Sequence, residues 1–319
     1  MLPPLLFAPL YRRYIWGGRR FASAFGRELP AGDDFAESWE LVDRGSEQSV
    51  VRAGPLAGET LGGIVRKHGE ELFGGRPPAA FPLLFKFLDA NRVLSVQVHP
   101  DDARAARLSP PDRGKTEAWY VLAAEPESRI YAGLREGVGP ADLAAAIRAG
   151  NCEEVLHAFN PVAGDCIFIP AGTVHAIGAG LLVAEIQQSS DVTYRLFDWN
   201  RTGPDGQPRP LHVDAGVEAV TRTGPVGAVT ARPSGDPAVR SLVSCEYFGL
   251  DEVRPGSAWR CSGGGRCRFL AVLSGGIGLP DRWGLPALGA GDCVLLPASA
   301  GEEELTAEDG TRLLQVTVP

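Results

Sequence analysis

The sequence predicts a mainly β fold, and three observations lead to this prediction. The 319 residues include 40 glycines and 26 prolines, a composition typical of many short strands joined by turns. Few segments show the apolar spacing of long helices. The unit Gly-Asp-Cys-Ile-Phe-Ile-Pro-Ala at 164–171 recurs as Gly-Asp-Cys-Val-Leu-Leu-Pro-Ala at 291–298, which indicates that one structural unit is used twice.

Composition argues against several classes of partner. A formal net charge of −8 argues against a nucleic-acid or anionic-membrane surface, and no apolar run has the length of a membrane span. Residues 2–10 contain prolines and lack the flanks of a signal peptide. The six cysteines are scattered without a Cys-x-x-Cys pair, as is typical of thiols in a reducing compartment. We therefore expect a cytoplasmic protein with neither a nucleic-acid nor a membrane partner.

The N-terminal part of the chain predicts strands around one helix. We expect an entering strand within 1–20 that ends at Trp-Gly-Gly and is followed by a polar loop. A second strand is expected at 36–42, where residues alternate, and a helix over 59–73, where apolar residues follow helical spacing. The continuous apolar run 81–88 then leads directly into a strand at 94–99.

Later segments alternate short helices and strands. Residues 101–108 and 139–149 predict helices, the second with a proline near its start and a glycine just past its end. Strands are expected at 155–159, 165–169 and 182–187. They are followed by a loop rich in glycine and proline at 202–210, a closing helix at 211–220 and a linker at 222–237.

The segment Leu-Ser-Val-Gln-Val-His-Pro-Asp-Asp at 94–102 carries the first chemical signal. Side chains two apart on a strand share a face, so Gln97 and His99 project together, and the proline that follows places them near the mouth of a sheet. Glu117 of a Gly-Lys-Thr-Glu segment and His175, which follows a Pro-Ala-Gly turn, would complete the set. Two imidazoles, a carboxylate and an amide oxygen suit a divalent ion with one open position, so we expect a catalytic metal site.

Charged residues elsewhere point to the same region. Lys86 interrupts an apolar run, so it should reach a carboxylate or a pocket. Glu185 and Gln187 share one face of their predicted strand. The turn that follows would bring Arg195 back beside that face.

The other histidines carry no such signal. His68 falls on the polar side of the predicted helix and is expected to be solvated, whereas His157 has no partner at ligand spacing and is taken as structural. In the register of the repeat Glu302 takes the place of His175, and no histidine follows His212. We therefore expect the second copy of the unit to bind no metal.

These motifs resemble those of the cupins, small antiparallel jelly rolls in which Gly-Asp-x-x-x-x-Pro-x-Gly-x-x-His supplies a late metal ligand. More closely, the chain resembles the short bacterial type I mannose-6-phosphate isomerases (phosphomannose isomerases), strongly over residues 1–220 and weakly beyond them. The matching segments are Trp-Gly-Gly at 16–18, Glu-Ser-Trp-Glu at 37–40, Leu-Asp-Ala-Asn at 88–91, the segment 94–102, Gly-Lys-Thr-Glu at 114–117, Pro-Ala-Gly-Thr-Val-His-Ala-Ile-Gly at 170–178 and Tyr-Arg-Leu-Phe-Asp at 194–198.

The resemblance implies two cupin (jelly-roll) β-domains with short helical insertions in the first. A catalytic domain would span 1–225, and a degenerate, metal-free cupin domain would span 238–319. The resemblance also implies one Zn²⁺ per chain, with the ligands Gln97, His99, Glu117 and His175.

The activity that the resemblance implies is zinc-dependent aldose–ketose isomerisation between mannose 6-phosphate and fructose 6-phosphate through a cis-enediol. The partner would be a small-molecule sugar phosphate, and the chain would be a monomer or a weak homodimer. Ala118 stands where the family favours cysteine, and we expect only a packing change there. The implied catalytic residues are Arg195, Glu185 and Lys115, and the implied substrate-binding residues are Lys86, Ser95, Lys115 and Trp16.

Two other functions stay open at this point. A cupin-type oxidoreductase would bind Fe(II) and oxygen through histidines and a carboxylate, but an amide ligand and the cations Lys115 and Arg195 argue against it. A non-catalytic sugar-binding cupin also fits, because a fold alone does not prove activity. Such a protein would be expected to have lost ligands that this chain retains.

Overall fold

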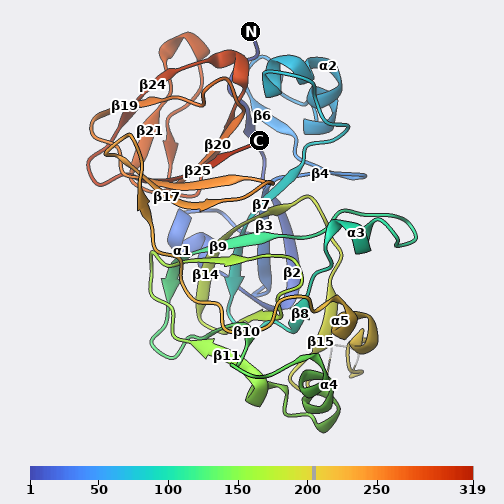
Figure 1. Cartoon of the computed structure of the whole chain (residues 1–319). Helices are drawn as coiled ribbons and strands as arrows, with labels where there is room; N and C mark the ends of the chain where they lie inside the picture. The colour runs from blue at the N-terminus through green and yellow to red at the C-terminus, as the bar shows by residue number, and fades with distance from the viewer. Residues whose placement is uncertain (203–205, 319) are drawn as a thin grey trace.

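The computed structural model describes residues 1–202 and 206–318, and its fold is mainly β, as the sequence predicts. In Figure 1 the orange to red strands form one lobe, beside which lie the blue strand β6 (Val51–Ala53) and helix α2 (Leu61–Phe73), and most of the remaining strands form the other lobe. Part of the predicted loop at 202–210, and the last residue of the predicted domain at 238–319, lie outside the described residues.

The first lobe, which we call the N-terminal unit, contains two sheets that face each other. Trp119 and Val183 of one sheet and Ile130 of the other belong to a single buried cluster between them. The six-stranded sheet has the order β12 (Cys166–Ile169), β9 (Glu117–Ala124), β14 (Leu181–Gln188), β7 (Leu83–Ala90), β3 (Phe35–Leu41) and β2 (Leu10–Gly18). The five-stranded sheet has the order β11 (Leu156–Phe159), β10 (Ile130–Leu134), β13 (His175–Ile177), β8 (Val96–Val98) and β15 (Tyr194–Phe197).

The second lobe, the C-terminal unit, repeats this arrangement with a six-stranded and a four-stranded sheet. The first has the order β16 (Arg232–Pro233), β17 (Val239–Ser244), β18 (Gly249–Val253), β25 (Arg312–Thr317), β20 (Arg268–Ser274) and β23 (Cys293–Leu296). The second has the order β19 (Ala258–Cys261), β24 (Glu303–Ala307), β21 (Gly276–Gly278) and β22 (Leu288–Gly289).

The two units pack sheet against sheet. Phe85 on β7 and Phe269 on β20 have ring centroids 4.8 Å apart, and both belong to one buried cluster that extends across the interface. Strand β7 is therefore covered on both faces, which explains why its sequence is a continuous apolar run rather than an alternation. The domain boundaries 1–225 and 238–319 stay predictions, and the shared core joins the regions that they would separate.

Short helices lie at the edges of the sheets. The polar loop predicted after residue 20 is wrong: α1 (Arg20–Phe25) forms there because Phe21 is fully buried and Gly26 ends the helix at a φ of 65°. The predicted helices are confirmed as α2 (Leu61–Phe73), α3 (Asp102–Ala105), α4 (Pro140–Ala149) and α5 (Val213–Ala219), with α3 shorter than predicted. The remaining elements are β1 (Leu6–Phe7), β4 (Asp43–Arg44), β5 (Glu47–Gln48), β6 (Val51–Ala53) and the 3₁₀ turns η1 (Cys152–Val155), η2 (Asp281–Trp283) and η3 (Ala298–Ala300).

The described part of the chain has no helix with both the length and the apolar character needed to cross a membrane.

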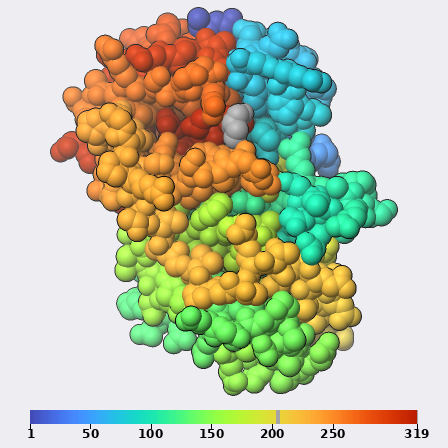
Figure 2. Space-filling model, in the orientation of Figure 1, coloured from blue at the N-terminus to red at the C-terminus, as the bar shows by residue number. Residues whose placement is uncertain are grey.

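The predicted linker at 222–237 is not a free spacer. Its backbone is held on the N-terminal unit, because Val226 N donates to Ala132 O at 3.0 Å and Val229 N donates to Cys166 O at 2.7 Å. In Figure 2 this yellow-orange segment lies across the green surface of that unit. Further along, β16 within the same segment pairs with β17 of the C-terminal unit, so the segment is bound to both units.

Candidate metal centre and active-site cavity

Three predicted ligands meet inside the N-terminal unit. Ligand atoms of His99, Glu117 and His175 all lie within 4.8 Å of one another, and each side chain is at most 1% exposed. His99 follows β8, Glu117 begins β9, and His175 begins β13, so both sheets contribute to the cluster. It is the one group of three or more such residues found within 1–202 and 206–318.

The strand register places the fourth predicted ligand beside this cluster. Gln97 on β8 lies directly opposite His175 on β13 and opposite Arg195 on β15. Residues directly opposite in an antiparallel pair project to the same face, so these three side chains share one face of the five-stranded sheet. Gln97 also lines the cavity described below.

Backbone carbonyls fix the tautomers of both histidines. His99 Nδ1 lies 2.9 Å from Val192 O, and His175 Nδ1 lies 2.9 Å from Thr173 O. Each Nδ1 must therefore carry the proton, which leaves each Nε2 with a free lone pair. These lone pairs face Glu117, with His175 Nε2 at 3.3 Å from Oε1 and His99 Nε2 at 3.5 Å from Oε2.

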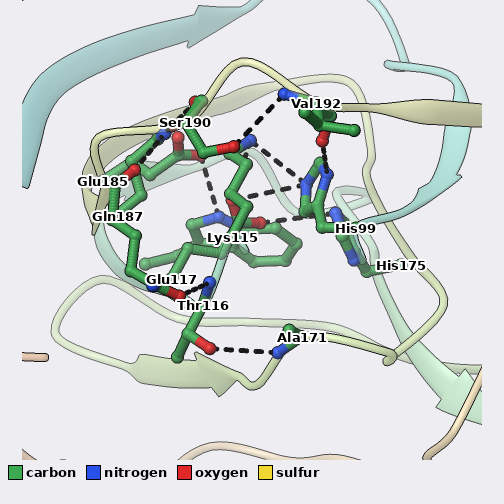
Figure 3. A network of polar contacts seen from close by, with 12 residues as sticks. His99, Lys115, Thr116, Glu117, Ala171, His175, Glu185, Gln187, Ser190 and Val192 are labelled. Carbon is green, nitrogen blue, oxygen red and sulfur yellow. Dashed lines mark hydrogen bonds and ion pairs between the residues drawn. The ribbon is translucent and has the colours of Figure 1, made fainter. Parts of the chain in front are cut away.

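The lone pairs of the two Nε2 atoms and of the Glu117 carboxylate repel one another unless a cation lies between them. Within 1–202 and 206–318, neither His175 Nε2 nor Glu117 Oε2 has a hydrogen-bond partner, although both atoms are buried. Lys115 Nζ supplies part of the missing charge at 3.0 Å from Glu117 Oε2 and 3.1 Å from His99 Nε2 (Figure 3). Converging imidazole and carboxylate donors with unsatisfied lone pairs fit a divalent metal ion.

Burial keeps the two histidines in the form that binds metals. It lowers the pKa of His175 to about 4, and burial, Lys115 and the neighbouring His175 hold the pKa of His99 well below its usual range. Both imidazoles are thus neutral near pH 7, as metal ligation requires. Burial raises the pKa of Glu117, and Lys115 acts against that rise.

A cavity of about 320 Å³ opens beside the cluster. Of the predicted substrate-binding residues, Trp16, Lys86, Ser95 and Lys115 all line it, and so do the predicted catalytic residues Glu185 and Arg195. Its other charged or aromatic lining residues, which the sequence interpretation did not place here, are Tyr14, Glu37, Trp39, Asp191 and Arg209.

Lys86 reaches carboxylates, as the sequence predicts. Its Nζ lies 3.0 Å from Glu185 Oε1 and 3.4 Å from Glu37 Oε2. Glu185 is directly opposite Lys86 in the β14–β7 register, and its Oε2 accepts a hydrogen bond from Trp119 Nε1 at 3.0 Å. Burial alone would raise the pKa of Glu185, but Lys86 and Lys115 lower it, so the carboxylate is ionised.

Two guanidinium groups line the cavity, and their charges are close enough to affect each other. Arg195 Nη1 donates to Pro210 O at 3.0 Å, while the buried Arg195 Nε has no partner among the residues that the structure describes. Burial lowers the pKa of Arg195, and the nearby Arg209 lowers it further. Two adjacent cations with an unused N–H group form an environment that favours an anion.

Arg209 is a site residue that sequence interpretation missed. It lies in a loop rich in glycine and proline, where no periodicity or motif signals its position. Asp198, the last residue of the matching Tyr-Arg-Leu-Phe-Asp segment, accepts a hydrogen bond from Arg209 Nε at 2.8 Å. That carboxylate needs a cationic partner, and it is the one signal in the sequence that pointed towards the arginine.

Of the three other histidines, His68 and His157 were predicted to have no ligand role, and neither belongs to the cluster. The side chain of His68 is 37% exposed and its Nδ1 lies 3.4 Å from Glu71 Oε1, so the predicted surface position is confirmed. His157 is on β11 and its ring lies 6.0 Å from that of Phe159.

The fold and the site together define a class: a β protein with a buried metal-binding donor set beside a cation-lined cavity. Comparison with known proteins gives the family. The family model described as phosphomannose isomerase type I, catalytic domain, matches residues 5–127. The mannose-6-phosphate isomerase of Streptococcus mutans serotype c is 35% identical over 93% of this chain and 93% of its own. Mannose-6-phosphate isomerase ManA of Bacillus subtilis is 34% identical over 95% of each chain.

Solved structures agree with these matches. The mannose 6-phosphate isomerase crystal structure from Bacillus subtilis superposes with a TM-score of 0.90 at 29% identity, covering 99% of both chains. The apo form of the Salmonella typhimurium mannose 6-phosphate isomerase shares the fold, with a TM-score of 0.77 at 16% identity over 100% of both chains. The chain therefore belongs to the type I phosphomannose isomerase family.

Proposed function

We propose that this protein is a zinc-dependent isomerase that interconverts mannose 6-phosphate and fructose 6-phosphate through a cis-enediol. One observation carries the proposal: the buried cluster of His99, Glu117 and His175 adjoins a cavity whose lining includes two lysines and two arginines beside three carboxylates. The relatives that match nearly the whole chain are named mannose-6-phosphate isomerases. An oxidoreductase acting on O₂ would have no use for so many cations around its substrate.

The metal ligands in this proposal are His99, Glu117 and His175, with Gln97 as the fourth. A bound Zn²⁺ would act as a Lewis acid for the negative charge that develops on the substrate oxygen during enolisation. The carbonyls of Val192 and Thr173 hold the two imidazoles with Nε2 facing inwards, so little reorganisation is needed when the ion binds.

The cations of the cavity would orient the sugar phosphate. Arg195 and Arg209 both line the cavity and are suited to the dianionic phosphate, because guanidinium groups bind phosphate in a bidentate manner. Lys115 lies next to the metal ligands and would stabilise charge on the enediol oxygens. Ser95 and Trp16 line the cavity and would contact the sugar.

Glu185 is our candidate for the group that moves the proton between C1 and C2. Its carboxylate lines the cavity and is ionised, so it can accept a proton. Lys86 and Trp119 fix its orientation from two sides.

We also propose that only the N-terminal unit binds a metal. Glu117 pairs with Ile169 in the β9–β12 register, and Arg268 pairs with Leu296, the repeat equivalent of Ile169, in the β20–β23 register. Arg268 thus occupies the position of the ligand Glu117. A buried guanidinium at this position supports a C-terminal unit without a metal ion.

The test is an isomerase assay on protein stripped of metal and then given zinc. We expect conversion of mannose 6-phosphate to fructose 6-phosphate to be lost on stripping, to return with zinc, and to be absent in His99→Ala. The surface variant His68→Ala serves as the matched control and should behave as the unmodified chain. A folded, zinc-loaded chain without turnover would contradict the proposal.

A further inference from the structure

The segment that carries Lys115 is held by hydrogen bonds to four residues, namely Pro100, Asp102, Ala171 and Gln188. Lys115 N donates to Pro100 O at 3.1 Å, and Ala171 N donates to Thr116 Oγ1 at 3.2 Å. Gly114 N donates to Asp102 Oδ1 at 2.7 Å. A Cβ on Gly114 would lie 2.6 Å from Asp102 N, so the two backbones touch and leave no room for another residue.

Gln188 connects this segment to the same aspartate. Its Oε1 accepts from Thr116 N at 2.9 Å, its own N donates to Thr116 O at 3.1 Å, and its Nε2 donates to Asp102 Oδ1 at 3.2 Å. Gln188 is only 4% exposed, so its amide has few alternative partners. Asp102 therefore fixes the segment both directly, through Gly114, and indirectly, through Gln188.

The last contact to Asp102 comes from the other unit. Tyr247, in the turn between β17 and β18, donates its hydroxyl to Asp102 Oδ2 at 2.7 Å. The turn is closed by Cys245 N donating to Phe248 O at 3.1 Å, and Phe248 is fully buried in the core between the units. Burial raises the pKa of Tyr247, and so does Asp102, so the hydroxyl keeps its proton and acts as the donor.

We infer that Tyr247 is a positioning residue: through Asp102 and Gln188, the C-terminal unit sets the backbone of the segment 114–117 and hence the place of Lys115 and Glu117. Asp102 Oδ1 accepts from Gly114 N and from Gln188 Nε2. Its Oδ2 accepts from Tyr247 Oη at 2.7 Å and lies 3.4 Å from Gln188 Nε2, so the tyrosine supplies the shorter and stronger restraint on that oxygen. The metal-free unit thereby contributes to catalysis without touching the substrate.

The effect on the segment is tested on metal-free protein by hydrogen–deuterium exchange. In Tyr247→Phe we expect the amides of Gly114 and Thr116 to exchange about fivefold faster, because one hydrogen bond that orders their acceptors is lost. Tyr120→Phe is the matched control: it also removes a tyrosine-to-carboxylate bond between the units, Tyr120 Oη to Glu252 Oε1 at 2.8 Å, but none that leads to Asp102. Exchange in this control should be unchanged over 113–117.

The kinetic part of the test rests on the proposed isomerase activity. We expect Tyr247→Phe to lower kcat about fivefold with KM within about twofold, since Lys115 is displaced from the reacting atoms rather than lost. Tyr120→Phe should keep both constants. Adding Tyr247→Phe to Asp102→Asn should cause no further loss, because the tyrosine acts through that aspartate.

The outcomes separate the two proposals. Faster exchange at 113–117 in Tyr247→Phe, with no isomerase activity in the unmodified chain, would support the positioning role and contradict the function. An active chain in which Tyr247→Phe matches Tyr120→Phe in exchange and kcat would overturn the inference. Additive losses in the double variant would also overturn it, since they would mean that Tyr247 acts by another route.

Discussion

The N-terminal and C-terminal units place opposite charges at the same point of similar sheets. Glu117 and Arg268 occupy equivalent positions in the strand register, and both side chains are 1% exposed. Around Glu117, lone pairs of two histidines converge and need a cation. Around Arg268, the cation is covalently part of the chain, and its guanidinium donates to the carbonyls of Cys261 and Gly301.

This difference shows what a metal site requires beyond a fold. Both units have a polar centre inside a small β-structure. In the C-terminal unit this centre is a guanidinium that donates to backbone carbonyls, and in the N-terminal unit it is a set of acceptors that a metal ion would satisfy. Only a metal ion bound by the N-terminal unit would have a coordination position open to a substrate. A buried arginine therefore stabilises the C-terminal unit, whereas the converging histidine and carboxylate groups of the N-terminal unit can bind a metal ion that takes part in catalysis.

Removal of the charge at Glu117 should have the largest effect on activity. We expect Glu117→Gln to lower kcat/KM about 10³-fold and to lose bound zinc, because an anionic ligand next to the reacting oxygen is gone. Zinc content and isomerase rate should be measured on the same sample. Glu59→Gln, at a surface carboxylate paired with Lys67, is the control and should keep both.

The reciprocal change in the C-terminal unit should affect stability and spare chemistry. Arg268→Met leaves two buried carbonyls without a donor, so we expect the free energy of unfolding to fall by about 3 kcal/mol. Arg260→Met, at an exposed arginine on β19, should change it little. Denaturant unfolding measures both. A zinc-dependent loss of kcat in folded Arg268→Met would contradict the division of roles.

The two centres should also differ in their response to acid. His175 has a pKa of about 4 in the folded chain against 6.5 unperturbed, so below pH 6.5 the unfolded chain binds a proton that the folded chain does not. Its contribution to stability should therefore be lost as pH falls, by about 2 kcal/mol between pH 7 and pH 5 in metal-free protein. Glu117 acts with the opposite sign, because burial raises its pKa.

The His175 contribution is isolated by comparing urea unfolding of the unmodified chain with that of His175→Gln at the two pH values. The stability difference between them should shrink on acidification. A constant difference would show that His175 is protonated in the folded state. The same comparison with Arg268→Met, which removes a guanidinium rather than an imidazole, should give a difference that is independent of pH.

The smallest expected effect concerns the two arginines that line the N-terminal cavity, Arg195 and Arg209. Arg209→Met should raise KM for mannose 6-phosphate about tenfold with a smaller change in kcat, since one of two phosphate-binding cations is removed. Arg201→Met is the control, because Arg201 also bonds Asp198, at 2.9 Å, but does not line the cavity. Equal KM values for both variants would place the phosphate elsewhere.

The sequence predicted those features that local pattern determines. Alternation and turn residues predicted several strands of the N-terminal unit. The two-residue spacing of Gln97 and His99 predicted that they share a face, and Gln97 lines the cavity beside the cluster that contains His99. Lys86 in an apolar run correctly signalled a buried ion pair, because an unpaired lysine there would be unfavourable.

The features that escaped prediction depend on contacts between distant segments. Helix α1 forms because Phe21 finds a buried place, which no local signal reveals. Arg209 and Arg195 are 14 positions apart in the sequence and come together only in the folded chain, where both line the cavity. The equivalence of Glu117 and Arg268 follows from strand pairing, and the unequal insertions between the repeated segments hide it in the sequence.

The central claim is that one metal ion, held by His99, Glu117 and His175, makes the N-terminal unit catalytic. It is tested most directly by titrating zinc into metal-free protein while following both bound metal and isomerisation of mannose 6-phosphate. The account predicts that activity rises in proportion to bound zinc and is complete at one ion per chain. Full activity in metal-free protein, or a requirement for a second ion, would contradict it.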